Sequence, residues 1–106
     1  GRILDVRGRP FTWDRLKIKI TSGGTLTYGS ASSITYDVFS GDSSGLKIVK
    51  DIDSETLTGN WDSVSNGMEI LASEGVYTTN DEFELECNPQ VSTRVQPVKY
   101  GFVGRL

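Results

Sequence analysis

Short segments in which apolar and polar residues alternate one by one are the feature that most constrains this chain. Residues 16–20 read LKIKI, residues 34–38 read ITYDV, and residues 82–87 read EFELEC. Successive side chains of a β-strand point to opposite faces of its sheet, so each segment predicts a strand with one apolar and one polar face. Shorter segments at 46–49 and 67–71 are further strand candidates.

Glycine, serine and asparagine separate these segments at short intervals. Turn signals stand at residues 22–24, 40–45, 58–60, 65–67 and 79–81. Tight turns need positive φ angles, which Gly and Asn adopt most easily. No stretch of a dozen residues repeats its apolar side chains with the period of a helix. The sequence therefore predicts an all-β chain that folds as a small antiparallel β-sandwich with extended terminal arms.

The length and the prolines suggest how the chain is divided. The 106 residues are enough for one domain, and the longest apolar runs are only a few residues, which predicts no contact with a membrane. Pro10, Pro89 and Pro97 lie outside the predicted central strands. We expect an N-terminal arm at residues 1–10, a β-sandwich body at residues 11–88, and a C-terminal arm or added strand at residues 89–106.

The phase of the alternation predicts which side chains are buried. Residues on the apolar phase should form the core, because a sheet buries one face. The predicted core residues are Ile18, Ile20, Ile34, Tyr36, Val38, Ile48, Ile70, Phe83, Leu85 and Cys87. Lysines and glutamates on the opposite phase should face solvent or a partner. These are Lys17, Lys19, Glu82, Glu84 and Glu86. If their strands are neighbours, we expect cross-strand charge pairs.

The chemistry available to the chain is narrow. It contains no histidine, so a Ser-His-Asp or Cys-His pair cannot form. The single cysteine, Cys87, continues the apolar phase and is expected to be a buried hydrophobe. The glycine-containing turns lack the Lys-Ser/Thr of a phosphate-binding loop. We therefore expect a protein that is not an enzyme, with no catalytic residues, no cofactor and no metal site.

A calcium site is the alternative use of the turn acids. Asp42, Asp51, Asp53 and Asp62 offer the oxygen ligands that Ca²⁺ prefers. The pattern lacks the glycine and the terminal glutamate of an EF-hand loop, so solvated acids are the favoured interpretation.

Charge is distributed unevenly along the chain. Residues 1–20 carry six basic side chains against two acids, residues 21–90 carry two against twelve, and residues 91–106 carry three against none. Basic ends suit an acidic body, either their own or that of a neighbouring copy. Direct binding of nucleic acid is disfavoured, because the acidic body would repel phosphates. The predicted subunit-interface residues are Arg2, Arg7, Arg9, Arg94, Lys99, Tyr100, Phe102 and Arg105.

Four segments carry a resemblance to a known class of domain. They are residues 20–25 (ITSGGT), 34–40 (ITYDVFS), 64–70 (VSNGMEI) and 75–85 (GVYTTNDEFEL). This series of strands and turns resembles a domain that recurs in bacteriophage virion proteins and in some flagellar and tail-fibre-like surface proteins. The final hairpin departs from the family pattern, with Asn80 at the position where the family has glycine.

The resemblance implies a β-sandwich that serves as a building block, decoration or attachment module. On this basis we expect a structural subunit of a virion (head decoration, neck or tail), with copies of itself and other virion proteins as partners. The alternative is a carbohydrate- or receptor-binding module of a tail fibre or adhesin, with a host-surface glycan as partner. Trp61 follows a turn and is the candidate ligand-binding residue, because partly exposed aromatic rings can stack on sugars.

Overall fold

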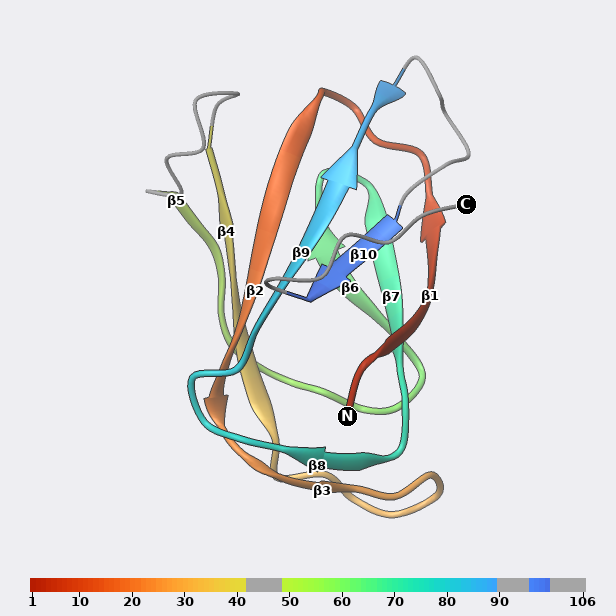
Figure 1. The fold of residues 1–106 in the computed structure, drawn as a ribbon, viewed down its shortest axis with the longest axis vertical. Coiled ribbons are helices and arrows are strands. Elements are labelled where there is room, and N and C mark those ends of the chain that lie inside the picture. The colour runs from red at the N-terminus through yellow and green to blue at the C-terminus, as the bar shows by residue number, and fades with distance from the viewer. Residues whose placement is uncertain (42–48, 90–95, 100–106) are drawn as a thin grey trace.

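The computed structural model describes residues 1–41, 49–89 and 96–99, which form ten strands and no α-helix (Figure 1). The strands are β1 (Ile3–Gly8), β2 (Asp14–Ser22), β3 (Gly24–Leu26), β4 (Thr35–Ser40), β5 (Val49–Thr56), β6 (Trp61–Ser65), β7 (Met68–Ala72), β8 (Gly75–Tyr77), β9 (Glu82–Cys87) and β10 (Gln96–Lys99). Within these residues, no helix has the length and apolar character needed to cross a membrane.

The strands pair into two stacked sheets and a short ribbon. One sheet has the order β1-β7-β6 and the other the order β10-β9-β2-β4-β5, and all pairs are antiparallel. The ribbon β3-β8 closes one end, at the bottom of Figure 1. The prediction of an all-β, antiparallel, sandwich-like fold is therefore confirmed.

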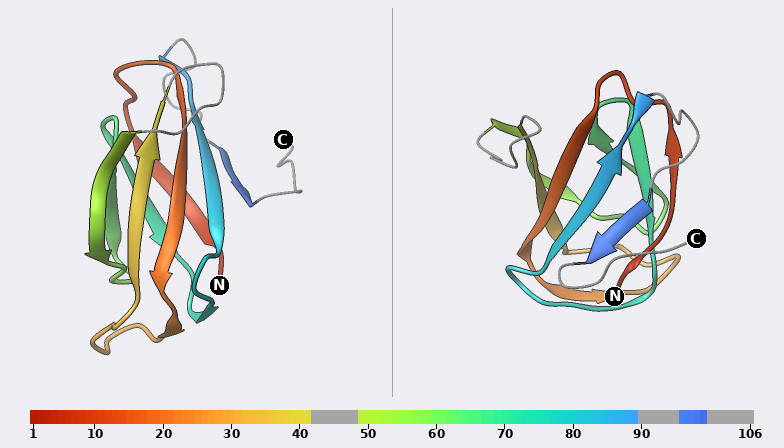
Figure 2. Two further views of the ribbon diagram at one scale, coloured as in Figure 1. Left: turned by 90° about the vertical axis from the view of Figure 1, so that its left-hand side faces the viewer. Right: turned by 45° about the horizontal axis from the view of Figure 1, so that its top comes forward.

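Each side of the sandwich is bordered by one edge strand from each sheet. β5 and β6 contact each other along one side, where the left view of Figure 2 shows them together, and β1 and β10 contact each other along the other. Residues 57–60 connect β5 directly to β6 and so carry the chain from one sheet to the other. This arrangement places the chain's two terminal strands together, away from β5 and β6.

The N-terminal segment is not a separate arm in the structure. β1 pairs with β7 of its own chain, from Ile3 opposite Ala72 to Gly8 opposite Met68. Ile3 is buried in the core, which explains why this segment is apolar. The expected boundary at residue 11 is corrected, because the sandwich includes β1.

At the other end of the chain, β10 pairs with β9 of its own chain as an added strand. Of the predicted C-terminal interface residues, Arg94, Tyr100, Phe102 and Arg105 lie outside the described residues.

The core matches the predicted phase. Of the ten predicted core residues, nine are at most 2% exposed, and Ile48 lies outside the described residues. Leu16, Leu26, Leu57, Val64, Met68 and Tyr77 complete the buried interior from other strands and connections. Phe83 packs edge to face against Tyr77, with ring centroids 6.2 Å apart. The apolar faces of the two sheets therefore meet as the alternation predicts.

The lysine-bearing strand β2 and the glutamate-bearing strand β9 are neighbours, which was the condition for the predicted cross-strand charge pairs. Lys17 of β2 lies opposite Glu84 of β9, and Lys19 lies opposite Glu82. Lys17 Nζ also reaches the Glu82 carboxylate diagonally, at 3.8 Å. The acids of β9 are thus offset by the bases of β2, and this face of the sheet carries little net charge.

Candidate functional site

A cleft of about 430 Å³ opens on the side of the sandwich where β5 and β6 run. Its walls are the edge strands of the two sheets, and the crossover connection closes one end. The lining residues are Tyr36, Asp51, Ile52, Asp53, Glu55, Thr56, Thr58, Trp61, Asp62 and Ser63. The cleft thus combines two aromatic side chains with four carboxyl groups.

Tyr36 of β4 spans the interior between the sheets. Its ring is buried, and its hydroxyl donates a 2.8 Å hydrogen bond to the backbone carbonyl of Ser63 on β6. Burial, together with the nearby carboxylates of Asp62 and Glu55, raises the pKa of Tyr36 far above its ordinary value. The hydroxyl therefore stays protonated and acts as a structural donor between the sheets.

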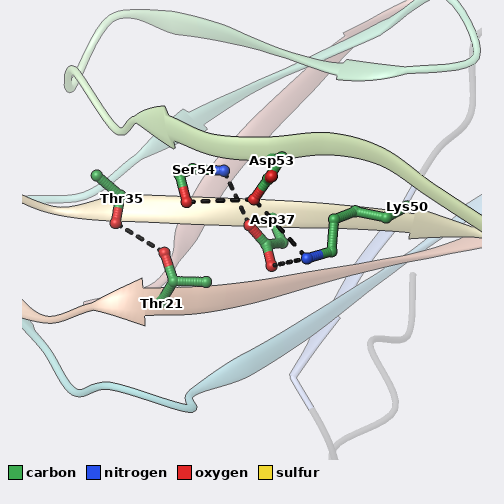
Figure 3. A network of polar contacts seen from close by, with 6 residues as sticks. All are labelled: Thr21, Thr35, Asp37, Lys50, Asp53 and Ser54. Atoms are coloured by element: carbon green, nitrogen blue, oxygen red, sulfur yellow. Dashed lines mark hydrogen bonds and ion pairs between the residues drawn. The ribbon is translucent and has the colours of Figure 1, made fainter.

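The irregular path of β5 is held by a buried carboxylate on the neighbouring strand (Figure 3). Asp37 of β4 is only 5% exposed and accepts a 2.9 Å hydrogen bond from the backbone N–H of Ser54. Ser54 has a φ of 56°, and the β4–β5 register shifts twice. The Nζ atom of Lys50 lies 3.3 Å from Oδ2 of Asp37 and 3.7 Å from Oδ1 of Asp53, so the lysine forms an ion pair with both carboxylates. These contacts fix the bulges, which twist an edge strand away from regular pairing.

Asp62 fastens the crossover from β5 to β6. Its carboxylate accepts a 2.9 Å hydrogen bond from the Thr58 hydroxyl and a 3.1 Å bond from the Thr58 backbone N–H. Burial raises the pKa of Asp62, and the hydrogen bonds from Thr58 and Gly59 oppose this shift. The Asp62 carboxyl group at this end of the cleft therefore stabilises the β5–β6 connection through hydrogen bonds and is not a free acid.

The remaining carboxylates project from β5. Asp51, Asp53 and Glu55 are all exposed, and Asp51 accepts a 2.8 Å hydrogen bond from the Ser65 hydroxyl across the cleft. Together, β5 and β6 carry four acidic side chains and one basic side chain, Lys50. The side formed by these two strands is strongly negative, and a cationic group is the ligand that its electrostatics favour.

Trp61 is half-buried at the cleft, which confirms that it is partly exposed. The guanidinium of Arg7 lies 4.3 Å from its ring centroid and also pairs with Glu69 at 2.7 Å. One face of the indole is thus covered by a cation–π contact from the same chain. A sugar could stack on that face only if Arg7 moved away.

Of the predicted basic interface residues that the structure describes, Arg2, Arg9 and Lys99 belong to or adjoin β1 and β10, whereas the side chain of Arg7 extends from β1 to Trp61 at the cleft. Arg2, Arg7 and Arg9 are exposed in or beside β1, and Lys99 ends β10. Among the described residues, neither Arg2 nor Arg9 forms an ion pair with a carboxylate of β5 or β6. Sequence reasoning did not place the cleft, although the run DIDSE at residues 51–55 was a signal of an exposed acidic strand.

The other candidate groups are occupied by contacts within the chain. Cys87 is buried, and burial raises the pKa of its thiol to about 11. Asp51, Asp53 and Asp62 each bind a neighbouring Ser, Lys or Thr, and Asp42 lies outside the described residues. Within the described part of the chain, no three acidic or cysteine side chains are grouped closely enough to hold a metal ion.

Comparison with protein-family models, with curated proteins and with solved structures finds no match to this chain.

Proposed function

We propose that this protein is a non-enzymatic structural subunit of a bacteriophage particle (head decoration, neck or tail), which assembles with copies of itself and with other particle proteins. The observation that carries the proposal is the separation of charge across the sandwich. The terminal strands β1 and β10 lie on one side, where the exposed Arg2 and Arg9 flank β1, and the carboxylates of β5 and β6 lie on the other. Among the described residues, Arg2 and Arg9 therefore form no ion pair with the carboxylates of β5 and β6 in their own chain.

The edge strands supply a second reason to expect assembly. Open strand edges have unpaired backbone groups that can accept a strand from a partner. The C-terminal residues beyond β10 include Tyr100, Phe102 and Arg105, which are aromatic and basic. Burial of the two aromatic side chains on a partner would supply affinity, while the arginine would favour an acidic surface.

The particle setting rests on the resemblance of residues 20–89 to the recurring virion domain. Purified particles of the phage that encodes the chain provide its test. We expect the protein to be present in purified particles at a stoichiometry that matches the symmetry of a head, neck or tail. Its absence from particles purified from a lysate that contains the protein would contradict the proposal.

Assembly itself is tested on the isolated chain. Removal of residues 100–106 spares β10 and should leave a folded monomer, whereas the full chain forms larger species. Sedimentation velocity measures the size and circular dichroism the fold. An unchanged oligomer after this truncation would rule out the C-terminal residues as an assembly element.

A carbohydrate-binding module is the second candidate function. The observation that favours it is the position of Trp61 beside carboxylates in the cleft, since rings and carboxylates together can bind sugars. Binding to a glycan array should then be lost in Trp61→Ala and retained in Trp13→Ala, because Trp13 does not line the cleft. Equal binding by both variants, or no binding by the unmodified protein, would reject this function.

A further inference from the structure

We infer that copies of this chain associate head to tail, with the β1–β10 side of one copy docked on the β5–β6 cleft of the next. This inference rests on the proposed function, since it names the two surfaces through which the subunit would assemble. Three features of the described residues support it: free basic groups on one side, uncompensated acids on the other, and the placement of these surfaces on opposite edges.

The β1–β10 side is called the donor surface here. It carries two arginines that form no ion pair with any described residue of their own chain. Arg2 and Arg9 flank β1, both are exposed, and neither forms an ion pair with a described residue. Arg7 differs, because it is held by Glu69 and Trp61. Two arginines on this side are therefore available to a partner, and arginine pairs with carboxylates through several donors at once.

The acceptor surface is the acidic surface that the chain does not neutralise itself. On β7 and β9 the carboxylates face bases: Glu82 and Glu84 lie opposite lysines of β2, and Glu69 pairs with Arg7. On the cleft side, Asp51 and Glu55 have no ion pair with a described residue, and Lys50 is engaged by Asp37 and Asp53. The cleft is also large enough to admit an arginine side chain, about 430 Å³.

The placement of these surfaces decides the symmetry of the contact. A two-fold contact of either side with itself would bring like charges together. A contact between the basic side of one copy and the acidic side of the next leaves one free surface of each kind at the two ends. Such a contact repeats, and it produces a ring if the rotation closes or a filament if it does not.

A charge-swap experiment tests the pairing. The acceptor variant carries Asp51→Lys and Glu55→Lys, and the donor variant carries Arg2→Glu and Arg9→Glu. Each variant alone should associate on the order of tenfold or more weakly than the unmodified chain at low salt, because each brings like charges together. An equimolar mixture of the two variants should regain association, because the glutamates introduced on the donor surface of one variant then face the lysines introduced at the cleft of the other. The control Thr27→Lys, Ser30→Lys, Ala31→Lys and Ser33→Lys raises the net charge by the same four units as the acceptor variant, at exposed residues of the β3–β4 connection.

The outcomes separate this inference from the function on which it rests. Regained association in the mixture, with an unaffected control, supports the head-to-tail pairing. If the unmodified chain assembles but the acceptor variant assembles equally well, the cleft is not the acceptor and the inference fails, while the proposed function stands. If the unmodified chain stays monomeric at every concentration and salt, both fail. Circular dichroism of each variant excludes loss of folding as the cause.

Discussion

The hydroxyl of Tyr36 and the backbone carbonyl of Ser63 form a 2.8 Å hydrogen bond that joins the two sheets of the sandwich. The bond links β4 in the middle of one sheet to β6 at the edge of the other. The bond is part-buried, and Ser63 itself is exposed beside the cleft. The cleft beside it therefore has a fixed wall, even though β6 is an edge strand.

Replacement of Tyr36 by phenylalanine removes this bond and keeps the ring. We expect the free energy of unfolding to fall by about 0.5–1.5 kcal/mol, because a part-buried hydrogen bond between the two sheets is lost. Urea denaturation measures the change. The matched control is Tyr28→Phe, which removes a bond to the Ala72 carbonyl from a ring that is 46% exposed. No loss of stability in Tyr36→Phe would contradict a role for this bond in joining the two sheets.

Phe83 tests the core. It is 2% exposed and packs against Tyr77, so Phe83→Ala should lower the free energy of unfolding by about 3–5 kcal/mol. Val76 on β8 is 64% exposed, so Val76→Ala should change the free energy of unfolding by about 0.5 kcal/mol or less. Thermal or urea denaturation compares the two variants. A small effect at Phe83 would mean that the two sheets do not pack as described.

The paired charges of β2 and β9 give a salt-dependent prediction. Changing Lys17 and Lys19 to glutamate places like charges opposite Glu84 and Glu82. The loss of stability should be about 0.2–1 kcal/mol for each position at low salt. It should shrink at molar salt, because salt screens charges that are partly exposed. A loss that does not depend on salt would show that the lysines act through packing of their aliphatic stems instead.

Asp62 predicts a particular pH dependence. Burial raises its folded-state pKa, so between the unfolded and the folded pKa the native protein binds more protons than the unfolded chain. This contribution to stability is complete at low pH and decreases as the pH rises through that window. Asp62→Asn keeps an oxygen for Thr58 and does not titrate. The stability of the unmodified protein relative to this variant should therefore fall as the pH is raised from about 3 to 7. A rise would contradict the burial of this carboxyl group.

The sequence predicts the interior strands well, because they alternate. β2, β7 and β9 bury one face each, so their apolar residues recur at every second position, and β4 follows the same pattern except that Asp37 on its polar phase is also buried. The turn at Asn80, with a φ of 77°, also forms where asparagine indicated a left-handed residue. The fold class follows from these local signals alone.

The edge strands could not be read in the same way. In β5 only Ile52 is partly buried and the other seven residues are exposed, so the sequence of this strand has no regular alternation of apolar and polar residues. In β1 a register shift between Ile3 and Asp5 interrupts the alternation, and the segment resembled an arm. Edge strands have one free side and fewer buried side chains, so their pattern reflects solvent more than packing.

The cleft could not be predicted at all from the order of residues. It forms where residues 57–60 carry the chain between sheets and bring β5 beside β6. Trp61 was identified as partly exposed, but its cation–π contact with Arg7 depends on β1 and β6 both pairing with β7. Such relations are properties of the assembled sheets.

The most direct test of the central claim is sedimentation velocity of the unmodified chain across a range of protein concentrations, at low and at molar salt. Head-to-tail association of oppositely charged sides predicts species larger than a dimer that grow with concentration at low salt and are lost or reduced at molar salt. A monomer at every concentration and at both salt levels would contradict the claim.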